Sequence, residues 1–173
     1  MGAAFALVAV IPFVPRTAGA QDAAPTAAPE TPRCDTPEYR QFDFWIGRWE
    51  VTGPDGRVAG RNSITRELDG CVIHERWEGG GVRGESFNIW DRARRQWHQT
   101  WVSSQGTLLM LDGGLRHGVM QMTGESGPPD RRILNRITWT PGADGSVRQL
   151  WEISADDGAT WRVVFDGSYR RLE

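Results

Sequence analysis

The sequence predicts an all-β protein: a single up-and-down antiparallel β-barrel of about ten strands. From Tyr39 onward, apolar and polar residues alternate over short stretches that Gly, Asp or Pro interrupts about every eight to twelve residues. Helical spacing is nowhere sustained for three turns. The interruptions are tight-turn sequences, so consecutive strands are expected to form hairpins. A long meander of hairpins usually closes on itself, because closure removes its exposed edges.

The length of 173 residues is normal for one domain. Residues 1–20 contain an apolar stretch too short to span a bilayer, and they end in Ala18-Gly19-Ala20, which is typical of a signal-peptide cleavage site. We therefore expect export to the periplasm or the medium and a mature chain that begins at Gln21. Residues 21–38 are rich in Ala and Pro, which predicts a tether, and residues 39–173 are predicted to form the barrel.

The two cysteines, Cys34 and Cys71, fit an oxidising compartment, where thiols pair. We predict a disulfide between them, which on the chain-entropy estimate stabilises the fold by about 4 kcal/mol. The alternative is two unpaired cysteines. A metal pair or a catalytic thiol would need neighbouring Cys or His ligands, which the sequence lacks.

The ten predicted strands cover residues 43–52, 57–67, 71–78, 84–91, 95–102, 106–112, 115–123, 131–140, 145–153 and 160–170. Turn sequences such as Gly79-Gly80-Gly81 and Asp112-Gly113-Gly114 separate them and can supply the positive φ angles of tight hairpins. Barrel diameter grows with strand number, so ten strands predict a cavity. The alternative is a flattened barrel that the nine Trp residues fill.

The opening segment, Phe42-Asp43-Phe44-Trp45-Ile46-Gly47-Arg48-Trp49-Glu50-Val51, resembles the first strand of a bacterial family of secreted domains of unknown function. That family is similar to lipocalin-like, calycin-type barrels. Further similarity lies in residues 70–77 and 96–102 and at Arg148-Gln149, Ser154, Asp157-Gly158 and Thr160-Trp161, so the resemblance covers most of the chain from residue 42 onward. It implies a lipocalin-like barrel and export. It implies no reaction, because the family has no established activity.

The net charge of −2 gives no reason to expect a nucleic-acid partner or a membrane-surface partner. No insertion into a membrane is expected after the signal is removed. All twenty basic residues are Arg. Arg suits anion recognition, but these residues are scattered without a dense basic run, which favours codon usage in a GC-rich genome as the cause.

On four strands the two-residue period places one polar residue in the middle of an inward stripe that also carries Trp. The polar residues are Glu75, Gln99, Asn135 and Gln149, and the Trp residues are Trp77, Trp97, Trp101, Trp139 and Trp151. We predict these nine residues as ligand-binding. A buried polar group without a partner costs about 1–3 kcal/mol, so the four must bond to one another, to indoles, to water or to a ligand.

The three His residues, His74, His98 and His117, form no metal motif, and no metal or other cofactor is predicted. His74 and His98 fall on the opposite face from the Trp residues of their strands, which predicts exposure. Haem barrels of the nitrobindin kind carry their axial His near the C-terminus, where this chain has none.

Three functions remain open. The first is an exported barrel that binds a small apolar or amphiphilic molecule in its lumen. The second is an isomerase or cyclase in which Glu75 acts as general base, since burial beside Ile73 and Trp77 would raise its pKa toward the useful range. The third is a structural envelope protein with a filled barrel. Fold alone does not choose among them.

Overall fold

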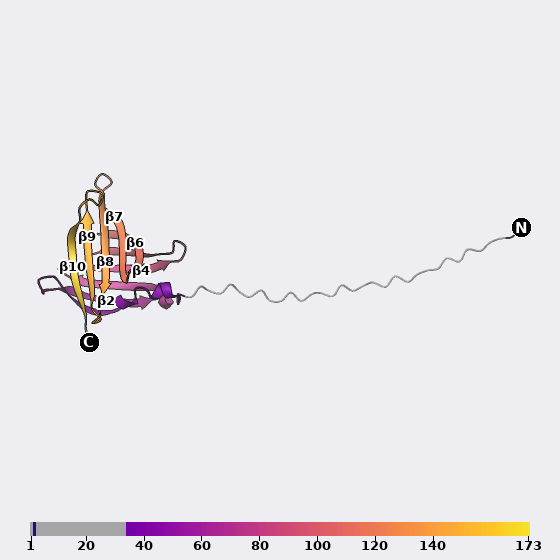
Figure 1. Ribbon diagram of the computed structural model, residues 1–173, viewed down its shortest axis with the longest axis horizontal. Helices are drawn as coiled ribbons and strands as arrows, with labels where there is room; N and C mark the ends of the chain where they lie inside the picture. The colour runs from indigo at the N-terminus through magenta and orange to yellow at the C-terminus, as the bar shows by residue number, and fades with distance from the viewer. Residues whose placement is uncertain (1, 3–33) are drawn as a thin grey trace. The chain divides into compact units, whose positions relative to one another are not determined.

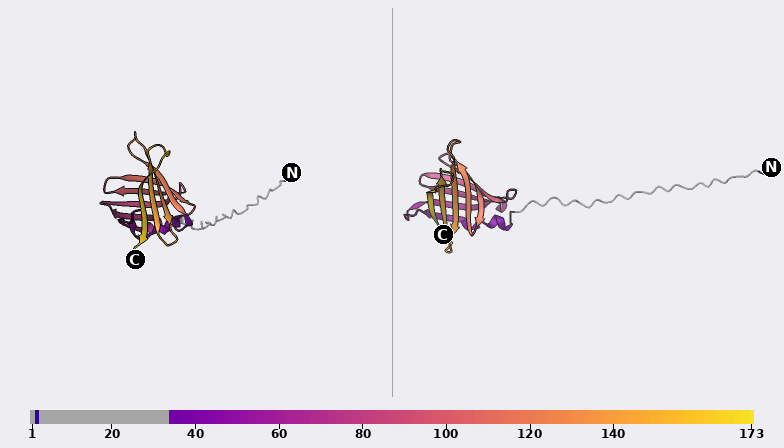
Figure 2. Two further views of the ribbon diagram at one scale, coloured as in Figure 1. Left: turned by 60° about the vertical axis from the view of Figure 1, so that its left-hand side comes forward. Right: turned by 45° about the horizontal axis from the view of Figure 1, so that its top comes forward.

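The computed structural model describes Gly2 and residues 34–173. Within residues 34–173, ten antiparallel strands close into one up-and-down barrel (Figure 1, Figure 2). The strands are β1 (Gly47–Thr52), β2 (Val58–Glu67), β3 (Val72–Gly79), β4 (Val82–Asp91), β5 (Gln96–Ser103), β6 (Leu108–Arg116), β7 (Val119–Ser126), β8 (Ile133–Pro141), β9 (Val147–Ser154) and β10 (Arg162–Arg171). Each pairs with its neighbours in sequence, and β1 pairs with β10 to complete the ring. The predicted fold class is confirmed.

The chain enters the barrel through two short 3-10 helices, η1 (Pro37–Arg40) and η2 (Asp43–Trp45). The prediction of a strand from residue 43 is therefore wrong, because β1 begins at Gly47. Phe42 and Trp45 are fully buried, and their rings stack at 4.9 Å. A 3-10 helix has three residues per turn, so this spacing places both rings on one side. The segment fills one end of the barrel instead of extending a strand.

The hairpin between β6 and β7 also differs from the prediction. Asp112-Gly113-Gly114, predicted as a turn, lies inside β6, and the turn is at His117-Gly118, where both φ angles are positive (49° and 82°). A Cβ atom at Gly113 would collide with the backbone carbonyl of Gln121 on β7. Glycine at this position permits close approach of two strands, a role that a sequence does not distinguish from a turn.

The disulfide between Cys34 and Cys71 is confirmed, with a Cα–Cα distance of 4.9 Å. Cys71 follows a third short helix, η3 (Leu68–Gly70), in the connection between β2 and β3. The Arg40 guanidinium reinforces the junction, since its Nη2 donates to the backbone oxygens of Cys34 (2.6 Å) and Gly70 (3.0 Å). A disulfide is typical of an oxidising, extracytoplasmic setting.

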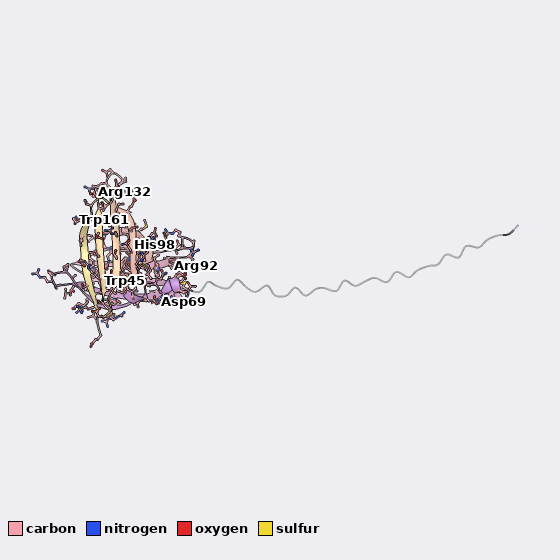
Figure 3. All side chains as sticks on the ribbon, in the orientation of Figure 1. Trp45, Asp69, Arg92, His98, Arg132 and Trp161 are labelled. Atoms are coloured by element: carbon pink, nitrogen blue, oxygen red, sulfur yellow. A yellow bond between two sulfur atoms is a disulfide. The ribbon has the colours of Figure 1, made fainter. Side chains whose placement is uncertain are left out.

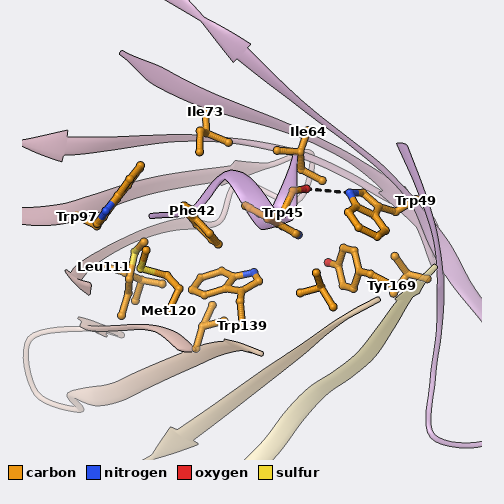
Figure 4. Close-up of a cluster of buried hydrophobic side chains, with 14 of the residues drawn as sticks. Phe42, Trp45, Trp49, Ile64, Ile73, Trp97, Leu111, Met120, Trp139 and Tyr169 are labelled. Carbon is orange, nitrogen blue, oxygen red and sulfur yellow. Dashed lines mark hydrogen bonds between the residues drawn. The ribbon is translucent and has the colours of Figure 1, made fainter. Parts of the chain in front are cut away.

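The main hydrophobic core occupies the end of the barrel that η2 enters (Figure 4). It contains Phe42, Trp45, Trp49, Ile64, Ile73, Trp97, Leu111, Met120, Met122 and Trp139. Edge contacts join Phe42 to Trp97 (5.7 Å) and Trp139 (5.2 Å) between ring centroids. We call this half of the barrel the closed half. The other half, toward the hairpins β1–β2, β3–β4 and β5–β6, is called the open half.

The predicted signal peptide, residues 1–20, and most of the predicted tether, residues 21–38, lie outside the described residues, as does the predicted mature terminus at Gln21. In the described part of the chain, the helices are short 3-10 turns, and none could span a bilayer.

Candidate functional site

The open half of the barrel contains a cavity of about 620 Å³. Most of the lining residues lie on eight of the ten strands, β2 to β6 and β8 to β10, where the period-two alternation directs side chains inward. Gly79, Gly80 and Val82 at the β3–β4 hairpin form part of the mouth. The walls are largely apolar and aromatic, with Trp77, Trp101, Leu109, Ile137, Trp151 and Phe165 among them. The polar residues of the lining include four on different strands, Glu75, Gln99, Gln149 and Tyr169, and three at or near the β5–β6 hairpin, Ser103, Gln105 and Thr107. A mostly apolar pocket with a few convergent polar groups is the usual construction of a small-molecule site.

The carboxyl group of Glu75 is the centre of the polar surface. Asn62 Nδ2 on β2 donates to Glu75 Oε1 (2.7 Å), and Ser86 Oγ on β4 donates to Glu75 Oε2 (2.6 Å). The register of the strands places both partners beside Glu75. Glu75 lies directly opposite Ser86 on β4, and on β2 it lies opposite Ile64, two residues along the strand from Asn62. Each oxygen therefore has a donor within the protein and keeps lone pairs for further bonds.

The network continues from Ser86 toward β5. Asn88 Nδ2 donates to Ser86 Oγ (2.9 Å) and to the Ile73 backbone oxygen (3.1 Å). Gln99 Nε2 donates to Asn88 Oδ1 (2.8 Å). Both hydrogens of the Asn88 amide and its oxygen are thus satisfied, and Gln99 is held with its amide at the cavity wall.

On the other side the network reaches β10 and β9. Asn62 Nδ2 also donates to the hydroxyl oxygen of Tyr169 (3.3 Å), and the Tyr169 hydroxyl donates to Gln149 Oε1. Seven buried side chains on six strands are therefore connected: Gln99, Asn88, Ser86, Glu75, Asn62, Tyr169 and Gln149. Asn62 Oδ1 is a buried acceptor without a partner among the described residues.

Burial dominates the electrostatics of this network. It raises the pKa of Glu75 to about 7, against the lowering effect of the hydrogen bonds from Ser86 and Asn62. Burial, together with the nearby Glu75 charge, raises the pKa of Tyr169 well above its ordinary value. Near neutral pH the cavity therefore holds a carboxyl group that can be protonated or ionised and a phenol that stays neutral.

Six of the nine residues predicted as ligand-binding line the cavity: Glu75, Trp77, Gln99, Trp101, Gln149 and Trp151. The structure does not bring the other three to it. Trp97 and Trp139 are in the core of the closed half, where the Trp97 indole donates to Gln41 Oε1 (3.1 Å). Asn135 is buried, but its amide bonds to Ser126 Oγ (2.8 Å) and accepts from the Trp151 indole (3.0 Å).

The sequence interpretation missed Asn62, Ser86, Asn88, Tyr169 and Phe165. A signal was present for two of them, since Ser86 and Asn88 alternate in step with Trp90 on β4. Asn62 lies on a strand without Trp, and a bulge in the pairing of β10 obscures the alternation that leads to Tyr169.

The predicted exposure of His74 is wrong, although the residue is on the outer face. Its ring stacks on Phe87 (4.4 Å between centroids), and its Nε2 lies 2.7 Å from Glu85 Oε2. These cross-strand neighbours on β4 leave it 7% exposed. His98, which is labelled in Figure 3, is half-buried, and its Nδ1 contacts Asp112 Oδ1 (2.8 Å) on β6.

Within residues 34–173, no group of three or more His, Cys, Asp and Glu side chains is placed to hold a metal ion. No protein-family model matches the chain, and no curated protein matches its sequence.

Proposed function

We propose that this protein is an exported, lipocalin-like barrel that binds a small apolar or amphiphilic molecule in its open half. The observation that carries the proposal is the cavity of about 620 Å³, in which apolar walls meet the polar groups of Glu75, Gln99, Gln149 and Tyr169. The volume lies within the usual range of about 300–1,000 Å³ for ligand pockets.

The hydrogen bonds of the polar groups support a role in orienting a ligand. Gln99 uses its Nε2 within the network, and its Oε1 accepts no hydrogen bond from the described residues. Gln149 uses its Oε1, and its Nε2 donates none there. One acceptor and one donor are therefore open for the polar end of a ligand, while the network holds both amides in place.

Export is proposed from the sequence of residues 1–20, and the disulfide between Cys34 and Cys71 supports it. The resemblance of residues 42–51 to a bacterial family of secreted, lipocalin-like domains points the same way.

A cavity-blocking substitution tests the binding function. Val82 lines the mouth, and the next residue, Arg83, is exposed and does not line this cavity. We expect a neutral fluorescent dye, phenylnaphthylamine, to bind the wild type and the control variant Arg83→Trp, and to lose most of its affinity for Val82→Trp. Equal affinity in all three proteins would place the dye elsewhere and contradict the proposal. Native mass spectrometry of protein from its own host then tests for a retained molecule.

A second candidate function is an isomerase or cyclase with Glu75 as general base. The pKa of about 7 favours it, because a base is most effective when its pKa lies near the working pH. Glu75→Gln keeps the shape of the side chain and removes the base. For an enzyme, turnover of a retained ligand is expected to disappear while binding persists. For a binding protein, no turnover is expected in either form.

A further inference from the structure

Donors converge on the carboxyl group of Glu75 from two sides. Ser86 Oγ accepts from Asn88 Nδ2, which leaves the Ser86 hydroxyl proton directed to Glu75 Oε2. Asn62 Nδ2 donates to Oε1. A carboxylate accepts with both oxygens, whereas a protonated carboxyl must also donate. The arrangement of donors therefore suits the ionised form.

Among the residues of the described chain that line the cavity, none carries a positive charge to balance this carboxyl group. The cavity lining contains no Arg and no His among the described residues, and Tyr169 is its other titratable group. The side chains that contact Glu75 from β2 and β4, Asn62 and Ser86, are neutral. Buried charges in proteins are ordinarily paired. The ionised form of Glu75 thus lacks a counter-charge.

Aromatic rings surround the space in front of this group. Trp77, Trp101, Trp151 and Phe165 all line the cavity, and Trp77 and Phe165 meet edge to face at 5.8 Å. The face of an indole attracts a cation, most strongly where water is excluded. An ammonium group would therefore meet favourable partners on several sides, whereas a carboxylate or phosphate would meet the charge of Glu75 without a cationic partner.

We propose that the cavity selects organic cations, in which an ammonium group on an apolar body sits against Glu75 between the indole rings. This inference rests on the binding function proposed above and specifies its ligand class. The ammonium hydrogens donate to the remaining lone pairs of Glu75 and to Gln99 Oε1, which accepts no other bond from the described residues. The apolar body fills the space beneath the mouth.

Binding of a cation is coupled to the proton on Glu75. Burial holds the pKa of this group at about 7, so a neighbouring ammonium favours loss of the proton. The affinity for an amine is therefore expected to rise as the pH increases from about 6 to about 8, with release of a proton to solvent. A neutral ligand has no charge to couple and is expected to show little change.

Three probes with the same aromatic body test the inference: naphthylethylamine, naphthylethanol and naphthylacetate. Calorimetry with the mature, disulfide-bonded protein at about pH 8 is expected to give an amine affinity at least about tenfold above that of the alcohol, with the carboxylate weakest. In Glu75→Gln the amine is expected to fall to the affinity of the alcohol, while the alcohol keeps its own. Glu78→Gln, on the exposed face of the same strand, is the matched control and is expected to behave as the wild type.

The outcomes separate the two proposals. If the alcohol binds as tightly as the amine, or if the carboxylate binds best, the cavity binds ligands but does not select cations, and the inference fails alone. If none of the probes binds and the neutral dye also fails to bind, the binding function fails with it. A thermal melt of Glu75→Gln shows whether the variant is folded, and Trp101→Leu supplies a second test, because loss of an indole should weaken the amine more than the alcohol.

Discussion

The closed and open halves of the barrel are built from the same alternation and rich in the same residue types, yet one is filled and the other is hollow. In the closed half, Trp45, Trp97 and Trp139 pack against Phe42 and are almost fully buried. In the open half, Trp77, Trp101 and Trp151 stand around a cavity and are only partly buried. The difference comes from the segment before β1, because η2 and Phe42 occupy one end of the lumen. Whether a barrel of this size is hollow depends on what enters its ends.

The largest effect on stability is expected when a core side chain of the closed half is removed. Phe42→Ala is expected to reduce the free energy of unfolding by about 3–5 kcal/mol, because it leaves a cavity among rings that cannot close around it. The control, Phe87→Ala, removes a ring that is 50% exposed on the outer face and should cost much less. Denaturant unfolding measures both. If Phe42→Ala reduces the free energy of unfolding no more than Phe87→Ala does, the Phe42 ring is not part of the core, and the contrast between the two halves is wrong.

The disulfide is expected to act on the same half with a somewhat smaller effect. It closes a loop with a sequence separation of 37 residues and ties Cys34 to the β2–β3 connection. Replacing both cysteines by Ser is expected to lower the free energy of unfolding by about 2–4 kcal/mol. Affinity for the neutral dye should change little in the folded variant, because neither residue lines the cavity. Loss of dye binding without loss of stability would show that the two halves are coupled.

The pH dependence of stability is expected to come from the open half. The pKa of Glu75 is about 7 in the folded protein and returns to its ordinary value of 4.5 on unfolding. Between these values the folded state binds more protons, so its stability falls as the pH rises. The contribution is complete below about pH 4.5 and is lost through about pH 7, which corresponds to about 3 kcal/mol.

Glu75→Gln removes this contribution and provides the test. The difference in unfolding free energy between wild type and variant should shift in favour of the variant from pH 5 to about pH 8. Glu78→Gln, whose side chain is exposed, should show no such shift. A difference that stays constant with pH would mean that Glu75 titrates normally and that the open half does not hold a perturbed carboxyl group.

The sequence predicts the barrel well because alternation and turn residues are local signals: ten strands are predicted and ten are observed, with several strand ends displaced by up to four residues. It fails where one residue type has two physical roles. Gly113 is predicted to lie in a turn but permits close contact between β6 and β7, and residues 43–46 are predicted as strand, but Asp43–Trp45 form a 3-10 helix at one end of the barrel. For a similar reason, the sequence predicts only part of the candidate site. Period two places Trp97 and Trp101 on one face, but the position along the strand decides which of them meets the cavity.

The smallest effects on stability are expected at two buried amides that the alternation of the sequence does not distinguish. Gln99 and Asn135 are both 2% exposed, and each takes part in at least two hydrogen bonds. Only Gln99 lines the cavity. Gln99→Leu and Asn135→Leu are each expected to cost about 1 kcal/mol of stability, because each leaves partners unsatisfied.

The two variants are expected to differ in their affinity for a probe. Gln99→Leu removes the free Oε1 acceptor from the cavity, so an amine or alcohol probe should bind several-fold more weakly, since an unpaired donor costs affinity. Asn135→Leu leaves that acceptor in place, and its effect on affinity should be small. Calorimetry with naphthylethanol measures both against the wild type. If both variants lose stability and neither loses affinity, Gln99 belongs to an internal structural network, and the polar surface of the open half serves the fold as the core of the closed half does.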